Sequence, residues 1–164
     1  MTPLPDGELI RRLLTAALLG ALLGFEREMK QKSAGLRTNV LIALGSALFT
    51  VMSYEMAEGD AADPSRIAAQ IVTGIGFLGA GAIMRTGSGV QGLTTAATVW
   101  VNAAVGVAAG GGEYHLAFIA TAVTLAALLV LQPLEVFIER RYGKPEDKPS
   151  QPADDDDRAG AGRG

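Results

Sequence analysis

The chain has 164 residues, of which 49% are hydrophobic and 21 are glycine, and its formal net charge at pH 7 is −3. It contains no cysteine, which excludes disulfides, thiolate catalysis and cysteine-based metal sites. The sequence has no basic patch with interleaved aromatic residues, so nucleic-acid binding has no support. Between Leu9 and Leu134 five apolar stretches follow one another, with nearly every charge between them. A soluble domain of this size could not bury five such stretches, and a polytopic membrane protein is therefore predicted.

Each apolar stretch is predicted to be a transmembrane α-helix, because a bilayer core about 30 Å thick is crossed by roughly 20 helical residues. We expect an all-α bundle with a membrane domain over residues 1–134. Residues 135–164 are expected to be a cytoplasmic helix end and a polar disordered tail. In chain order, the predicted spans are Leu9–Phe25, Thr38–Tyr54, Ile67–Met84, Gly92–Gly110 and Tyr114–Leu134.

The charges between the stretches predict the orientation of the bundle. Lys and Arg are concentrated in the first and third loops and in the tail, whereas the second loop is acidic. Since basic loops remain in the cytoplasm, the N-terminus is expected outside and the C-terminus inside. The third helix is expected to begin at Asp63, which can cap it, with Pro64 in its first turn.

Small residues recur at helical spacing within the spans. Helices in lipid associate through close backbone contact, so these residues are predicted to pack helices together; a flexible wall that lines a cavity or forms a hinge is the alternative. The third span is the richest in glycine and is expected to be central and tightly packed. The predicted packing glycines are Gly20, Gly24, Gly74, Gly76, Gly79, Gly81, Gly106 and Gly110.

Polar residues form two stripes, each with helical spacing that places its side chains on one face. A polar group in a membrane needs a partner, so the stripes are expected to face each other or a hydrated cavity. Interhelical hydrogen bonding and a functional pocket are both open interpretations. The stripes consist of Arg66, Gln70 and Thr73 in the third span and of Thr95, Thr98 and Asn102 in the fourth.

Further charged and polar residues gather where the spans meet the basic loops. An ion network of Glu26 with Arg27 or Arg37 is expected there, the alternative being charges that only anchor helix ends. The other candidate functional residues near span ends are Thr38, Asn39, Asp63, Arg85 and Thr94.

Several functional classes are disfavoured by the residues that are missing from the sequence. No Asp or Glu lies near the middle of any span, which weighs against a cation or proton pathway built from carboxylates. No nucleotide-binding, hydrolase or metalloprotease motif occurs, and His115 is the one histidine. We therefore expect no enzyme, no metal site and no cofactor.

Five sequence blocks follow one another along the apolar region, namely Gly20–Arg27, Ala34–Asn39, Asp63–Gln70, Gly74–Gly81 and Gly92–Ala97. In this order they resemble the MgtC/SapB family of bacterial inner-membrane proteins. The resemblance covers Leu9 to Leu134 and implies a multi-pass inner-membrane protein of five spans. The family is associated with growth at low magnesium and, in pathogens, with survival inside macrophages. The resemblance implies a functional role for ten of the candidate residues, whereas Arg85 and Asn102 are candidates on physical grounds alone. The ten are Glu26, Arg27, Arg37, Thr38, Asn39, Asp63, Arg66, Gln70, Thr94 and Thr95.

The resemblance also carries expectations about function. One family member is associated with inhibition of the proton-driven ATP synthase by membrane contact, and it has a cytosolic ACT-like domain where this chain has a polar tail. This chain therefore resembles a short form. We expect a regulatory or adaptor protein in adaptation to low magnesium or stress, which contacts the bilayer and either a second copy or another membrane protein such as the ATP synthase. The alternatives are a channel or carrier for a small solute or a divalent cation such as Mg²⁺, and a scaffold that binds lipid headgroups.

Overall fold

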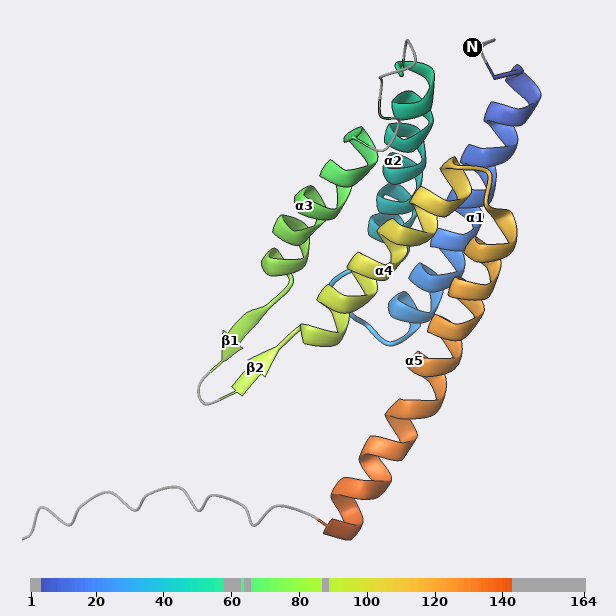
Figure 1. The fold of residues 1–164 in the computed structure, drawn as a ribbon. Helices are drawn as coiled ribbons and strands as arrows, with labels where there is room; N and C mark the ends of the chain where they lie inside the picture. The colour runs from blue at the N-terminus through green and yellow to red at the C-terminus, as the bar shows by residue number, and fades with distance from the viewer. Residues whose placement is uncertain (1–3, 58–62, 64–65, 87–88, 143–164) are drawn as a thin grey trace, which may run out of the picture.

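The computed structural model describes residues 4–57, 63, 66–86 and 89–142, which form five α-helices and one short β-hairpin (Figure 1). The prediction of an all-α chain is confirmed, while the predicted tail beyond residue 142 and Pro64 lie outside the described residues. The helices are α1 (Asp6–Met29), α2 (Leu36–Glu55), α3 (Arg66–Gly81), α4 (Leu93–Gly110) and α5 (Tyr114–Tyr142), and the strands are β1 (Met84–Thr86) and β2 (Gly89–Gln91).

The hairpin corrects the predicted third span. The sequence predicts one continuous helix over Ile67–Met84, but α3 ends at Gly81, and Met84 pairs with Gln91 in an antiparallel ladder. Gly92 then allows the chain to enter α4. Its φ of 91° is unfavourable for other residues, and a Cβ there would clash with the carbonyl oxygen of Ala82.

Successive helices run in alternating directions, and α4 lies at the centre of the bundle (Figure 1). It packs against all four other helices, whereas α5 packs against α1 and α4. The helix α3 lies at one edge, against α2 and α4. This order places the end of α1, the start of α2, the hairpin and the distal part of α5 towards the same end of the bundle.

The core is built mainly from small side chains, which lets the helices approach closely. One buried cluster joins α1, α2, α4 and α5, and a second joins α2, α3 and α4 with the α1–α2 loop. The first consists of Ala16, Leu19, Ala43, Ala47, Val105, Ala109 and Ala117, and the second of Ala34, Ile42, Ile75, Val99 and Ala103.

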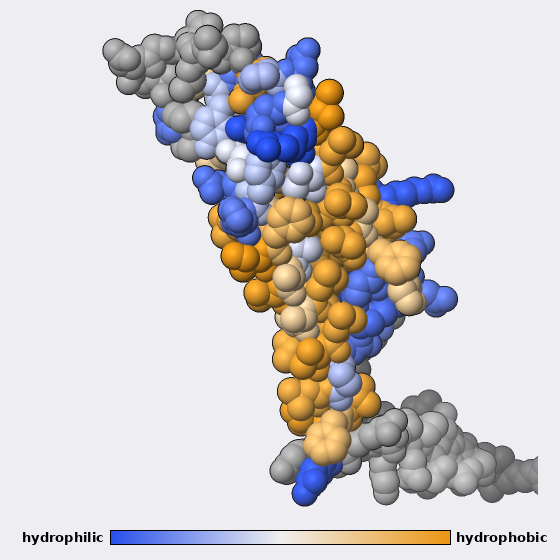
Figure 2. All heavy atoms as spheres, turned by 90° about the vertical axis from the view of Figure 1, so that its right-hand side faces the viewer, coloured by the Kyte–Doolittle hydropathy of each residue, from blue (hydrophilic) through white to orange (hydrophobic). Residues whose placement is uncertain are grey.

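Large apolar side chains cover the outside of the bundle. Figure 2 shows them as a broad hydrophobic surface on the face that carries α5, with hydrophilic residues gathered at the upper end and along the right-hand flank of the view. Three described helical segments are long and apolar enough to cross a bilayer, namely Leu36–Glu55, Leu93–Gly110 and Tyr114–Ile138. The helix α3 is apolar but has only 16 residues. So much exposed apolar surface suits lipid rather than water as the surrounding solvent.

Candidate functional site

A buried amide bridge joins α2 to α4. The Nδ2 of Asn102 donates to the backbone oxygen of Asn39 at 2.7 Å and to its Oδ1 at 3.1 Å. The Nδ2 of Asn39 in turn donates to the carbonyl oxygens of Ala34 at 2.8 Å and Gly35 at 2.9 Å. Both asparagines are fully buried. The bridge thus fixes the start of α2 against the middle of α4.

The two predicted polar stripes do not face each other, so the first of the two predicted arrangements is wrong. Thr95, Thr98 and Asn102 are buried, and Asn102 reaches α2. On α3, by contrast, Arg66, Gln70 and Thr73 are exposed. The spacing correctly identifies a shared face on each helix but contains no information on which neighbour that face meets.

Replacing Asn102 with leucine is expected to lower the free energy of unfolding by about 1–3 kcal/mol, because the oxygens of Asn39 lose a buried donor. Thermal unfolding in detergent, followed by circular dichroism, measures the effect. Thr124→Val is the control, since the Thr124 hydroxyl donates only to Ala120 in its own helix. Equal losses in the two variants would argue against an interhelical role for the bridge.

An ion cluster lies at the end of α1. Arg27 Nε is 2.8 Å from Glu26 Oε2, and Lys30 Nζ is 2.7 Å from Glu26 Oε1. Glu26 and Arg27 are only 7% and 2% exposed. Lys30 Nζ also donates to the carbonyl oxygen of Leu128 at 3.2 Å, which ties the cluster to α5. Of the two predicted partners for Glu26, the structure selects Arg27, while Arg37 is exposed.

Beside this cluster a cleft of about 330 Å³ opens between the end of α1, the start of α4 and α5. Arg27 lines it, and the Nη1 of Arg27 is buried without a hydrogen-bond partner. Pro133 lies in α5 next to the cleft. Because proline has no backbone N–H, the helical hydrogen bond to the carbonyl oxygen of Leu129 is missing there. The complete lining is Arg27, Lys32, Thr94, Ala127, Leu128, Leu131, Gln132 and Glu135.

Sequence reasoning identifies Arg27 and Thr94 as candidates but misses Gln132 and Glu135. These two residues flank Pro133, and a proline between polar residues near the end of an apolar span is the signal that could have drawn attention to them.

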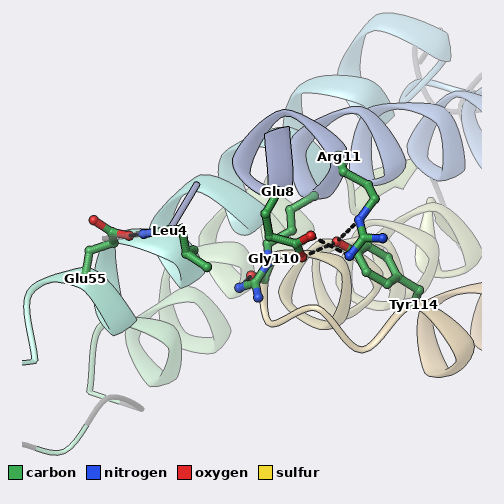
Figure 3. A network of polar contacts seen from close by, with 7 residues as sticks. Leu4, Glu8, Arg11, Glu55, Gly110 and Tyr114 are labelled. Atoms are coloured by element: carbon green, nitrogen blue, oxygen red, sulfur yellow. Dashed lines mark hydrogen bonds and ion pairs between the residues drawn. The ribbon is translucent and has the colours of Figure 1, made fainter. Parts of the chain in front are cut away.

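A polar network at the opposite end joins α1 to the start of α5 (Figure 3). The Glu8 carboxylate accepts hydrogen bonds from Arg12 Nε at 3.0 Å and from the Tyr114 hydroxyl at 2.8 Å, and it also pairs with Arg11. The Arg11 guanidinium lies over the Tyr114 ring, 4.8 Å from its centroid. The hydrogen bonds from Arg12 and Tyr114 hold the pKa of Glu8, which precedes the predicted first span, below its ordinary value.

The same network reaches α2 and α4. Arg12 Nη1 donates to the carbonyl oxygen of Gly110 at 2.8 Å, and the Leu4 amide donates to Glu55 Oε1 at 2.8 Å (Figure 3). These contacts satisfy backbone and charged groups where four helices begin or end, which is a structural role.

Four predicted packing glycines lie at very close helix contacts, all against α2. A Cβ at Gly20 would lie 2.8 Å from the Asn39 carbonyl oxygen, and one at Gly110 would lie 2.7 Å from the Cα of Ala47. Such distances leave no room for a side chain. The four are Gly20, Gly24, Gly106 and Gly110.

The glycines of α3 differ, and the prediction of a central, tightly packed third helix is wrong. A Cβ at Gly74, Gly76 or Gly81 would meet nothing within 4 Å, and one at Gly79 would make ordinary contacts with Ala96. Between α2 and α3 lies an apolar groove of about 500 Å³, which Gly74 and Gln70 help to line. Within one chain, the glycine-rich helix therefore leaves much of its surface without a partner.

The remaining candidates are not brought together into one site. Thr38 lines the groove between α2 and α3. The carbonyl of Asp63 accepts from the Arg66 amide at 3.4 Å, and Arg85 is exposed on the hairpin opposite Val90. Among residues 4–57, 63, 66–86 and 89–142, no cluster of His, Asp and Glu able to hold a metal ion is found.

The family model and the similar proteins that match this chain point to the same family. A family model described as the MgtC family matches residues 13–137. Protein MgtC of Salmonella typhi is 48% identical and that of Salmonella choleraesuis (strain SC-B67) 52% identical, each over 142 residues that cover 81% of this chain and 60% of the relative. Protein MgtC of Brucella suis biovar 1 is 51% identical over 127 residues, or 77% of this chain and 52% of that protein. The chain thus spans about half to three-fifths of the length of these relatives. No solved structure matches it with significant similarity.

Proposed function

Because this membrane protein belongs to the MgtC family, we propose that it regulates other proteins of the bacterial inner membrane through direct helix contact, in adaptation to low magnesium or stress. The proposal includes five bilayer crossings, with the N-terminus outside and the C-terminus in the cytoplasm. Its support is that the charges of α1 gather near its two ends, where water is available, and that α3 carries no charged residue after Arg66.

The observation that carries the proposal is the outer face of α3. Ala69, Thr73, Gly76 and Ala80 follow one another at spacings of four, three and four residues, which places them on one stripe. All four are exposed, and a side chain at Gly76 would meet nothing within 4 Å. Small residues at this spacing let a second helix approach closely in lipid.

The proposed occupant is a transmembrane helix of another protein or of a second copy of this chain. From the family resemblance, the ATP synthase is a candidate partner. Neighbouring Phe77 is 81% exposed, so it supplies a large apolar side chain at the edge of the stripe for such a helix to contact.

The polar residues inside the helix bundle give less support to the alternative of a channel or carrier. The polar stripe of α4 is closed by the Asn39–Asn102 bridge, and both side chains are fully buried. The buried carboxylate of Glu26 lies in an ion cluster at the end of α1 rather than along a path through the bundle. A conducting path would need a hydrated row of polar groups between the two ends.

A crosslinking experiment tests the proposal. A photoreactive phenylalanine analogue at Phe77 is expected to form an adduct, in native membranes, with a membrane protein or a second copy identified by mass spectrometry. Gly76→Leu should reduce the adduct at least about tenfold, because the leucine side chain blocks close approach.

The matched control is Gly7→Leu, since Gly7 also has nothing within 4 Å of a Cβ but lies at the start of α1. This variant should retain the adduct. An adduct that is unchanged by Gly76→Leu, or a label that reaches only lipid, would contradict the proposal.

A further inference from the structure

The buried guanidinium of Arg27 carries a donor without a hydrogen-bond acceptor, and a ligand bound in the cleft beside it could supply that acceptor. Arg27 is 2% exposed, and its one ion-pair partner within the described residues, Glu26, is reached through Nε. Its Nη1 is buried without a hydrogen-bond partner. A buried charged donor without an acceptor is costly, so an acceptor from outside the chain would be strongly favoured here.

The geometry points to a binding site in this cleft for the phosphate of a membrane phospholipid headgroup. The cleft brings the cationic side chain of Lys32, the hydroxyl of Thr94 and the amide of Gln132 around the same space as Arg27. All four can donate hydrogen bonds, and phosphate oxygens accept several donors at once. Arginine in particular suits phosphate because its planar guanidinium offers paired donors.

The charge of the site matches a phosphodiester better than free phosphate. Arg27, Lys30 and Lys32 supply three positive charges, and Glu26 and Glu135 supply two negative ones. One net positive charge is the complement of the single negative charge on a phospholipid diester. Glu135 lies on the cleft lining, where it can accept a hydrogen bond from a headgroup hydroxyl or amine.

The apolar wall of the cleft suits an acyl chain. Ala127, Leu128 and Leu131 form this wall, and Leu131 is 50% exposed on the outer surface of α5. A lipid with its phosphate at Arg27 could therefore lay its chains along α5. The cleft also lies at the end of the bundle that carries the basic first loop, and the cytoplasmic leaflet is where such loops meet anionic lipid.

Binding of short-chain phosphatidylglycerol to the full chain in detergent, measured by native mass spectrometry, tests this site. The double variant Glu26→Gln/Arg27→Gln, which removes the buried pair together, should weaken binding about 100-fold. Lys32→Ala should weaken it about tenfold, whereas Arg37→Ala, which removes an exposed cation outside the cleft, should leave it unchanged. A thermal melt of each variant establishes that it is folded.

Three results would overturn the inference. Equal weakening by Lys32→Ala and Arg37→Ala would mean that only surface charge attracts the lipid. Equally strong binding of diacylglycerol with the same chains would mean that the phosphate is not recognised. Displacement of the lipid by inorganic phosphate at a similar concentration would assign the cleft to free phosphate instead.

Discussion

Gly106→Ala is expected to lower the free energy of unfolding by about 3 kcal/mol, the upper part of the usual range for overpacking. A Cβ at this position would clash with the backbone oxygen of Ala43 and would lie 2.8 Å from the Cβ of Ser46. Neither neighbour is a flexible side-chain end, so α2 and α4 would have to move apart. That movement would also strain the nearby Asn39–Asn102 bridge.

The same substitution at Gly45 provides the control for Gly106→Ala. Gly45 lies in the interior of α2, and a Cβ there would meet nothing within 4 Å. Alanine should raise stability at this position by about 0.5–1 kcal/mol through its helix propensity. The midpoint temperature of thermal unfolding in detergent, followed by circular dichroism, should therefore shift down for Gly106→Ala and up for Gly45→Ala. A similar shift in both would show that the α2–α4 contact is looser than the structure indicates.

The second large effect is expected from Glu26→Gln, with a loss of about 3–5 kcal/mol in the free energy of unfolding. This change leaves the guanidinium of Arg27 buried without its carboxylate partner, 2.8 Å away in the native protein, and it also removes the partner of Lys30. Breaking one half of a buried ion pair costs more than removing both halves, because an uncompensated charge remains.

A double-mutant cycle distinguishes this mechanism from a general loss of packing. Glu26→Gln/Arg27→Gln should recover most of the stability that Glu26→Gln loses. Glu113→Gln, at an exposed acidic residue between α4 and α5, should change stability by less than about 0.5 kcal/mol. A double variant that is less stable than either single variant would indicate that the pair is not coupled in this way.

The helices were largely predictable because their signals are local. Runs of apolar residues locate all five helices, and glycine pairs four apart, such as Gly20 with Gly24, locate faces that pack closely. The hairpin was also signalled locally, by the sequence Gly87-Ser88-Gly89 between short polar segments, but the continuous hydrophobicity before Met84 hid it.

The arrangement of the helices was less predictable because composition does not specify a neighbour. Glycine density indicates that α3 can be approached closely, and the structure shows that its own chain leaves Gly76 open. Likewise, Asn102 was identified as polar within a span, but its partner Asn39 is 63 residues away in the sequence. The cleft needed the fold as well, since it unites Arg27 from α1 with Gln132 from α5.

The short length of α3 has a further consequence for the bilayer. Its 16 residues make a helix about 24 Å long, less than the roughly 30 Å of hydrocarbon that a typical membrane presents. The hairpin that follows cannot extend the span, because unpaired strand edges require water. Under the five-crossing arrangement, acyl chains beside α3 must compress to match it. A neighbouring protein with an equally short span would share this deformation of the bilayer and so reduce its free-energy cost. Hydrophobic mismatch would therefore favour association of a partner with this side of the protein.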